Sequence, residues 1–183
     1  MTDLRILRTK HAIRTAFLEL LETQEFKQIS VQDIADKAMI NRNTFYKHYS
    51  GKSALASEMI ADFKAEYAAM LQKRLATPNV TEAMQELAQG LFQKRRQLLA
   101  LWKIDTRRHH LYQDMETMIK QTFIRQANNT FPDKTTDWDY QATLFAVNVL
   151  TTARYYFERD LIPPFPQVFH QWREMFAVMG VKI

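Results

Sequence analysis

One run of residues, 41–52, combines hydrogen-bond donors with aromatic side chains at helical spacing. Phe45 and Tyr49 are four residues apart, so on a helix they share one face, which predicts that they point inward. The other positions carry side chains that donate hydrogen bonds to base edges or phosphate oxygens. A short helix that is anchored by an apolar inner face and is polar outside fits the DNA major groove, ~12 Å wide. The run therefore predicts a recognition helix over 42–49.

The position of each polar residue along this helix decides its expected role. The first turn of a recognition helix meets base edges, and for Arg42 we leave open whether it binds a base or a phosphate. Later outward-facing residues, and Lys52 at the start of the next helix, are expected to donate to phosphate. The expected DNA-binding residues are Ser30, Arg42, Asn43, Thr44, Tyr46, Lys47, His48 and Lys52.

Three further helices must position this segment. Apolar residues from Ile13 to Leu21 repeat on one helical face, and Ser30, with Asp33 three residues later, predicts the capped start of a second, short helix. Asn41 is a good cap for the recognition helix, and a long helix follows from Ser53 to before Pro78. Several cations crowd the start of the first helix and suit either phosphate or solvent: Arg5, Arg8, Lys10, His11 and Arg14.

The run 41–55 resembles the signature of TetR-family regulators: Thr-Phe-Tyr, one variable residue, His and an aromatic, then Lys and Leu. Phe17, the turn at Phe26 and the segment 30–35 also match, so the resemblance covers about residues 8–60. It implies an N-terminal DNA-binding domain, a helical C-terminal domain that binds small ligands, and dimerisation through the last two long helices. Many members have Gly in the tight turn where this chain has Met39, and a positive φ there would cost about 1 kcal/mol.

Composition supports an all-α fold, with an N-terminal three-helix helix-turn-helix domain and a larger C-terminal helical domain. The 183 residues are 46% hydrophobic and include only 3 Gly and 5 Pro. Residues 1–52 hold nine Lys and Arg against six Asp and Glu, a modest basic bias that suits a polyanion. We expect domains at 1–52 (continuing into a linking helix, 53–76) and 77–183.

Several function classes are not expected. The chain has no Cys, which excludes disulfides, thiolate zinc sites and cysteine nucleophiles. No Ser-His-Asp arrangement, glycine-rich phosphate loop or catalytic carboxylate pair stands at a convincing spacing, so we expect no enzyme, no cofactor and no metal. The start lacks a signal-peptide core, and the longest uncharged stretch, 140–153, is shorter than the roughly 20 residues of a membrane helix. We expect a cytoplasmic protein with no membrane partner.

The C-terminal half predicts helices separated by a loop at 128–133. Residues 83–102 read as one amphipathic helix, with a bend near Gly90 or 94–96. The segment 140–159 is apolar on nearly all sides, which predicts burial all round. We expect a homodimer through helices 140–159 and 165–180, with burial inside one chain as the alternative.

The lining of a ligand pocket is predicted less sharply, because the same residues could simply fill the core. Aromatic and Met side chains make adaptable walls, and Asn148 or Thr151 would supply polar groups. The candidates are Trp102, Met115, Met118, Phe123, Phe145, Asn148, Thr151 and Tyr155. For His109 and His110 we expect a solvated helix start, with an anion or metal site as the alternative.

Together these features predict a sequence-specific transcriptional regulator that binds a double-stranded DNA operator. We expect a homodimeric repressor that an unknown small-molecule effector releases from DNA. The alternative is a co-regulator of the same fold whose C-terminal domain binds a partner protein instead. Loss of DNA binding by the purified protein on adding small molecules alone would favour the first.

Overall fold

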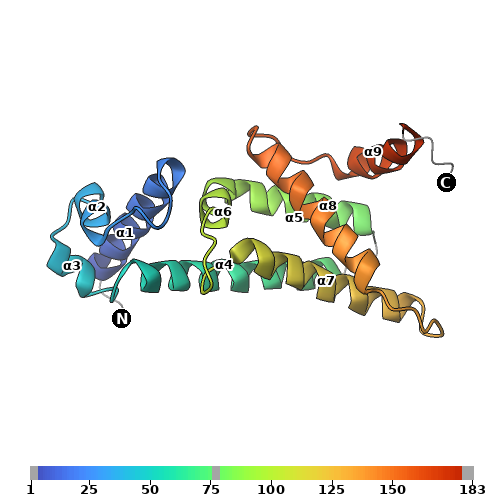
Figure 1. Cartoon of the computed structure of the whole chain (residues 1–183), viewed down its shortest axis with the longest axis horizontal. Coiled ribbons are helices and arrows are strands. Elements are labelled where there is room, and N and C mark those ends of the chain that lie inside the picture. Colours follow the sequence, from blue (N-terminus) through green and yellow to red (C-terminus); the bar gives the residue numbers. More distant parts are fainter. Residues whose placement is uncertain (1–3, 76–78, 179–183) are drawn as a thin grey trace. The chain divides into compact units, whose positions relative to one another are not determined.

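A computed structural model describes residues 4–75 and 79–178, and within these ranges it contains helices and no strand (Figure 1). The expected all-α fold is confirmed. The helices are α1 (Leu4–Thr23), α2 (Val31–Lys37), α3 (Arg42–Tyr46), α4 (Lys52–Leu75), α5 (Val80–Gln93), α6 (Arg95–Trp102), α7 (Leu111–Thr130), α8 (Asp139–Phe157) and α9 (Phe165–Val178).

The chain forms two compact units. The first combines Met1–Glu66 with Arg96–Met115, and the second combines Tyr67–Arg95 with Glu116–Ile183. Helices α4 and α7 therefore each contribute residues to both units. The division into domains at residues 52 and 77 remains a prediction.

Local capping sets the starts of α2 and α3, as the sequence predicts. The Ser30 hydroxyl accepts from the Asp33 amide at 3.1 Å, and the Asp33 carboxylate accepts from the Ser30 amide at 2.7 Å. This reciprocal pair satisfies two amides that a helix start leaves without partners. Asn41 caps α3 by accepting from the Asn43 amide at 2.8 Å.

Helix α3 is shorter than expected and ends at Tyr46 instead of Tyr49. The Lys47 amide is shared between the carbonyls of Asn43 and Thr44, and the His48 amide donates to Phe45 at 2.9 Å. Hydrogen bonds to the carbonyl three residues back, instead of four, tighten the last turn, which is common at helix ends.

The turn between α2 and α3 holds Met39 in the left-handed region, with φ of 53°. The Met39 amide donates to the Asp36 carbonyl and the Ile40 amide to the Ala35 carbonyl, both at 3.0 Å. This is the Schellman arrangement, in which Gly usually fills the place that Met39 takes here. The Met39 side chain is 92% exposed, so only the backbone is constrained.

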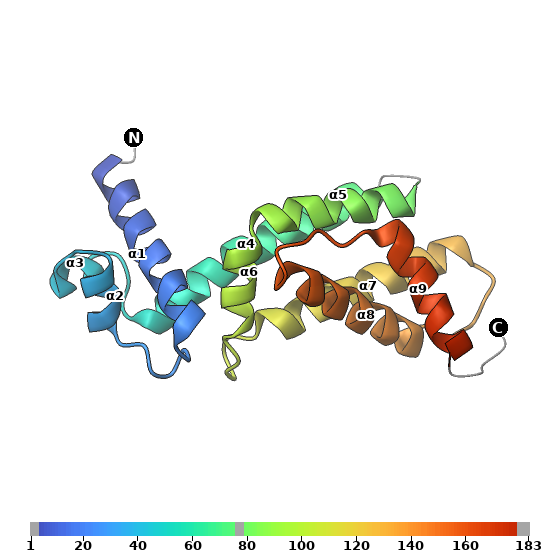
Figure 2. The same cartoon turned by 90° about the horizontal axis from the view of Figure 1, so that it is seen from above.

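In the second unit, α5 and α9 lie side by side (Figure 2), and the Phe165 amide donates to the Gln85 side chain at 3.1 Å. The helix expected over 83–102 is two helices, because the chain breaks at Lys94, whose φ of −110° and ψ of 13° leave the helical region. The expected loop at 128–133 begins later than predicted, because α7 continues to Thr130.

Helix α8 is buried on one face only in the single chain, so burial inside one chain, the alternative to the dimer, does not cover it on all sides. Its inner face is buried at Ala142, Ala146 and Val149, whereas the opposite face exposes apolar side chains. The exposed large hydrophobic residues of α8 are Tyr140, Leu144, Val147 and Tyr155.

Candidate nucleic-acid interface

Helix α3 presents polar side chains outward from an anchored inner face. Phe45 is fully buried and Tyr49 nearly so, with their rings 5.7 Å apart, as the four-residue spacing predicts. Arg42 and Asn43, in the first turn, are exposed. The geometry is that of a short helix held by an aromatic pair and open to a ligand.

Arg42 and Tyr46 form a pair on this surface. The Arg42 guanidinium donates to the Tyr46 hydroxyl at 3.3 Å and lies 5.6 Å from the centre of its ring. The contact restricts the Arg42 side chain before any ligand arrives, which reduces the entropy lost when it binds.

The remaining expected contacts in this region differ in exposure. Lys47 is exposed, whereas Thr44 and His48 are half-buried. The Ser30 oxygen accepts from the Asp33 amide, and the Ser30 side chain also hydrogen-bonds the Asp33 carboxylate, so Ser30 is engaged at its own helix start. The DNA contacts of these residues remain predictions.

Lys52 has a structural role that the sequence did not reveal. Its ammonium donates to the carbonyls of Phe26 at 2.8 Å, Lys27 at 3.0 Å and Ile29 at 2.5 Å. It also lies 4.9 Å from the Phe26 ring, and burial lowers its pKa. An ammonium has three donors, and all three have protein acceptors here, so phosphate binding by Lys52 would compete with the α1–α2 loop.

The cations at the start of α1 differ in how far they are exposed. Lys10 binds Glu58 at 3.1 Å, and Arg14 binds Glu58 at 2.6 Å and Asp62 at 2.7 Å. Burial alone would raise the pKa of Glu58, but hydrogen bonds from Lys10 and Arg14 outweigh it and lower the pKa. These two cations therefore hold α1 against α4, whereas Arg5 and Arg8 remain exposed.

The segment between α6 and α7 joins the same unit through His109, which is 4% exposed. Its Nε2 lies 2.8 Å from the Ser57 hydroxyl, and its ring packs edge-on against Phe26 with the ring centres 5.9 Å apart. The expected solvated helix start was wrong for this residue, because tertiary packing covers it. Within the described residues, no group of acidic and histidine side chains is arranged to hold a metal.

The eight expected pocket residues are divided between the two units, and their role as the lining of a ligand pocket remains a prediction. Trp102 and Met115 belong to the first unit, where the indole N–H donates to the Met115 sulfur at 3.4 Å. Phe123 packs against Phe145 with ring centres 5.3 Å apart, inside the second unit. The others sit elsewhere on their helices: Asn148 is half-buried and donates to the Leu144 carbonyl, and Thr151 and Tyr155 are exposed.

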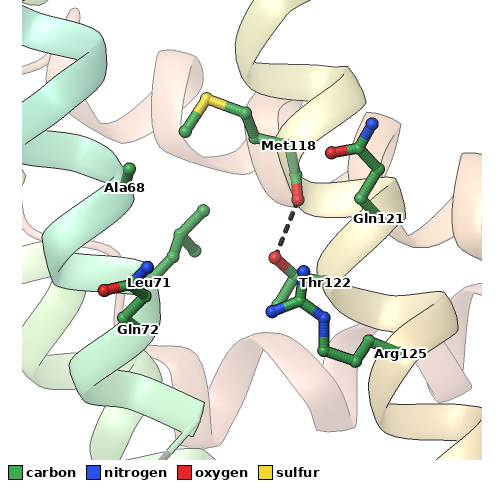
Figure 3. Close-up of a pocket in the computed structure, with 7 residues that line it drawn as sticks. All are labelled: Ala68, Leu71, Gln72, Met118, Gln121, Thr122 and Arg125. Carbon is green, nitrogen blue, oxygen red and sulfur yellow. Dashed lines mark hydrogen bonds between the residues drawn. The ribbon is translucent and has the colours of Figure 1, made fainter.

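Met118, the remaining one of the eight, lines an open groove in the second unit (Figure 3). The Thr122 hydroxyl at its floor donates to the Met118 carbonyl at 2.8 Å and so is committed within α7. The complete lining is Ala68, Leu71 and Gln72 from α4 and Met118, Gln121, Thr122 and Arg125 from α7. Sequence reasoning missed the α4 residues because nothing in that helix shows which of its faces meets α7.

Comparisons with known proteins point to one family. Residues 13–59 match the family described as bacterial regulatory proteins of the tetR family. Over 65 residues the chain is 43% identical to the uncharacterized HTH-type transcriptional regulator YxbF of Bacillus subtilis (strain 168), which covers 35% of this chain and 17% of that relative. The chain therefore matches less than a fifth of that relative's length.

Solved structures show the same fold over nearly the whole chain. A TetR transcriptional regulator from Streptococcus agalactiae 2603V aligns with a TM-score of 0.67 at 19% identity, covering 94% of this chain and 96% of that one. NalD, the secondary repressor of the MexAB-OprM multidrug efflux pump in Pseudomonas aeruginosa, aligns with a TM-score of 0.62 at 19% identity, covering 93% and 96%. The resemblance inferred from the run 41–55 is confirmed: the helix-turn-helix segment at residues 13–59 is that of the tetR family of bacterial regulatory proteins.

Proposed function

We propose that the chain is a homodimeric transcriptional repressor that binds an operator through α3 and releases it when a small molecule binds the second unit. The observation that carries DNA binding is the exposed first turn of α3 on its buried aromatic anchor, with the Arg42 side chain restrained by Tyr46. NalD is a repressor of similar fold. We place this chain in the cytoplasm, because that is where its proposed DNA target lies. We infer no enzymatic activity.

The exposed face of α8 supports the dimer. Tyr140, Leu144 and Val147 are separated by four and three residues, so they form one stripe, and Tyr155 continues it two turns later. An isologous dimer, the commonest oligomer, would cover this stripe with its own copy. Leu161, beyond the end of α8, and Met175 of α9 are also exposed and would extend the interface.

The groove between α4 and α7 supports the response to an effector. Its lining residues lie on α4 and α7. Earlier segments of these two helices carry the Lys64–Asp114 ion pair at 2.8 Å, and Ser57 of α4 contacts His109, which lies just before α7. A ligand that changes the spacing of α4 and α7 in the groove would therefore act on these contacts in the DNA-binding unit. Effector and DNA would oppose each other through one coupling free energy, typically ~1–3 kcal/mol.

The test of DNA binding uses fluorescence anisotropy on a duplex that the full chain selects from random sequence. Arg42→Gln should weaken binding about five- to hundredfold, the range expected for one base contact, whereas Arg107→Gln, an exposed cation outside α3, should change it little. Equal affinities of both variants and the wild type would reject α3 as the recognition helix.

The test of the dimer compares Leu144→Glu with Gln141→Glu, which adds the same charge to an exposed position of the same helix that is already polar. Light scattering after size exclusion should give twice 21.7 kDa for the wild type and Gln141→Glu, and a single-chain mass for Leu144→Glu. A dimer that survives Leu144→Glu would move the interface away from α8.

The alternative is a co-regulator that binds a partner protein. In that case the exposed face of α8 would be covered by another protein instead of a second copy of this chain. A monomeric wild type whose DNA binding changes only on adding cell proteins, and not small molecules, would support it.

A further inference from the structure

We infer that the groove between α4 and α7 selects an anionic effector, a small molecule that carries one carboxylate on an apolar body, and that Arg125 recognises its charge. This inference rests on the proposed function, which assigns the effector to this groove, and it adds the chemical class of that effector. The observation that carries it is a single cation on the rim of a groove whose other lining residues are all uncharged.

The inner part of the groove is apolar. Leu71 of α4 is 5% exposed, and Ala68 and Met118 on the two walls are half-buried. The Thr122 hydroxyl already donates to the Met118 carbonyl at 2.8 Å, so none of these four side chains offers a ligand an unused donor. A ligand gains free energy here by covering apolar surface and removing it from water.

The rim of the groove is polar and carries one charge. Gln72, Gln121 and Arg125 are exposed and line it. In Figure 3 the Arg125 side chain points from α7 into the groove, toward α4. The residues that line the groove include no Asp or Glu, so the charge of Arg125 is not balanced within the lining.

Arg125 has no acidic neighbour along its own helix. Side chains three and four residues apart are the ones that pair on a helix. The residues at these positions on α7 are uncharged: Gln121, Thr122, Asn128 and Asn129. Residues 68–72 on the opposite wall are uncharged as well. Among the described residues the Arg125 guanidinium has no hydrogen bond or ion pair, so it is available to a ligand.

One guanidinium matches one negative charge. A carboxylate carries a single charge and accepts two parallel hydrogen bonds from an Arg side chain. A phosphate monoester carries about −1.5 to −2 at neutral pH, which a single Arg does not balance, and Arg125 would repel a cation. A carboxylate at the rim with an apolar body over Leu71 and Met118 satisfies both parts of the groove.

The first experiment measures the binding of three probes to the full chain by isothermal titration calorimetry. Octanoate, octanol and octyltrimethylammonium share a straight alkyl chain and differ in the charge of the head group. Octanoate should bind the wild type about tenfold more tightly than octanol, because only the carboxylate forms charge-assisted hydrogen bonds with Arg125. The cation should bind most weakly.

Variants of Arg125 test whether this residue causes the preference. Arg125→Gln should bind octanoate and octanol about equally, and Arg125→Glu should reverse the preference in favour of the cation. Arg107→Gln removes an exposed cation that does not line the groove and should keep the wild-type preference. Thermal melting of each variant should match the wild type, which separates a lost contact from a lost fold.

A matched pair of variants on α4 tests the apolar part of the groove. Ala68→Leu places a larger side chain in the lining and should weaken octanoate binding. Ala69→Leu adds the same side chain at the next residue, which is exposed and does not line the groove, and should leave octanoate binding unchanged. Equal octanoate binding by these two variants would place the alkyl chain outside the groove and overturn the inference.

A further measurement connects the groove to DNA binding. Octanoate, at a concentration that saturates the wild type, should weaken its binding to the selected duplex about 5- to 150-fold, the range of typical coupling free energies. Arg125→Gln at the same concentration should lose most of this response.

The inference would be overturned if none of the three probes bound the wild type, if octanol or the cation bound as tightly as octanoate, or if Arg125→Gln bound octanoate unchanged. The proposed function fails separately. If octanoate bound as expected but left DNA binding unchanged, the anion site would stand and the assignment of the groove to an effector that releases DNA would fall.

Discussion

The ammonium of Lys103 donates to the Glu22 carbonyl at 2.8 Å and to the Leu21 carbonyl at 3.1 Å. The carbonyls at the end of a helix lack partners within that helix, and here a residue that follows α6 satisfies two of them at the end of α1. A cation at this end also interacts favourably with the helix dipole. The segment 103–110 is therefore fastened to the DNA-binding unit at both ends, by Lys103 and by His109.

Replacing Lys103 with Met tests the first of these contacts. Lys103→Met keeps the apolar stem but leaves two carbonyls without a donor, so the free energy of unfolding should fall by about 1–2 kcal/mol. Urea unfolding at neutral pH measures this. Arg107→Gln, four residues later and exposed, is the control and should leave the midpoint unchanged. An unchanged midpoint for Lys103→Met would show that the contact contributes nothing in solution.

Burial of His109 makes stability depend on pH. Burial lowers the pKa of its imidazole, as do the nearby charges of Arg108 and His110, against a hydrogen bond to the Ser53 backbone that raises it. Other groups that face the ring are Ser57, Phe26 and Thr106. Below the ordinary His pKa of about 6.5, the His109 imidazole is protonated in the unfolded chain but still neutral in the folded chain. This contribution to stability is complete above that value and is lost as the pH falls through the lower pKa of the folded state.

The measurement is urea unfolding at about pH 7.5 and 5.5, on either side of the ordinary His value. The wild type should lose more stability between these conditions than His109→Gln does. His11→Gln, which removes an exposed imidazole of α1, should behave as the wild type. Identical pH dependence of all three proteins would contradict the role given to His109.

Lys52 could either hold the α1–α2 loop or bind a DNA phosphate, and one variant distinguishes these two roles. Lys52→Met removes the donor that joins the carbonyls of Phe26 and Ile29, and should lower the free energy of unfolding by about 1–3 kcal/mol. Lys47→Gln, an exposed cation, should leave stability unchanged. If Lys52→Met instead melted as the wild type and reduced the salt dependence of DNA binding by about one, Lys52 would serve phosphate and not the loop.

The turn at Met39 predicts a stabilising substitution. A left-handed backbone costs a side-chain residue about 1–2 kcal/mol, part of which Gly gives back through its greater freedom in the unfolded chain. Met39→Gly should therefore raise the free energy of unfolding by about 0.5 kcal/mol, measured by urea unfolding. Met39→Ala keeps the strain and removes an exposed side chain, so it should change little. Destabilisation by Met39→Gly would mean that the Met39 side chain has a partner in solution.

Local features of the fold could be predicted because their causes are local. Ser30 with Asp33 marked the start of α2, and the spacing of Phe45 and Tyr49 marked the buried face of α3; both are confirmed. Breaks that depend on the rest of the fold were placed less well, as at Lys94, where one expected helix is two, and at Thr130, where α7 continues into the expected loop.

The sequence by itself determined the all-α class, the caps of α2 and α3 and the helix-turn-helix signature, because periodicity, capping and a spaced motif act over a few residues. Only the tertiary structure decided which cations pair with acidic residues of another helix. Lys10 and Arg14 look free in the sequence, yet Glu58 and Asp62 of α4 bind them. Such pairs join residues far apart in the chain, up to 82 positions for Lys103 and Leu21, and only the packing of whole helices brings them within hydrogen-bonding distance.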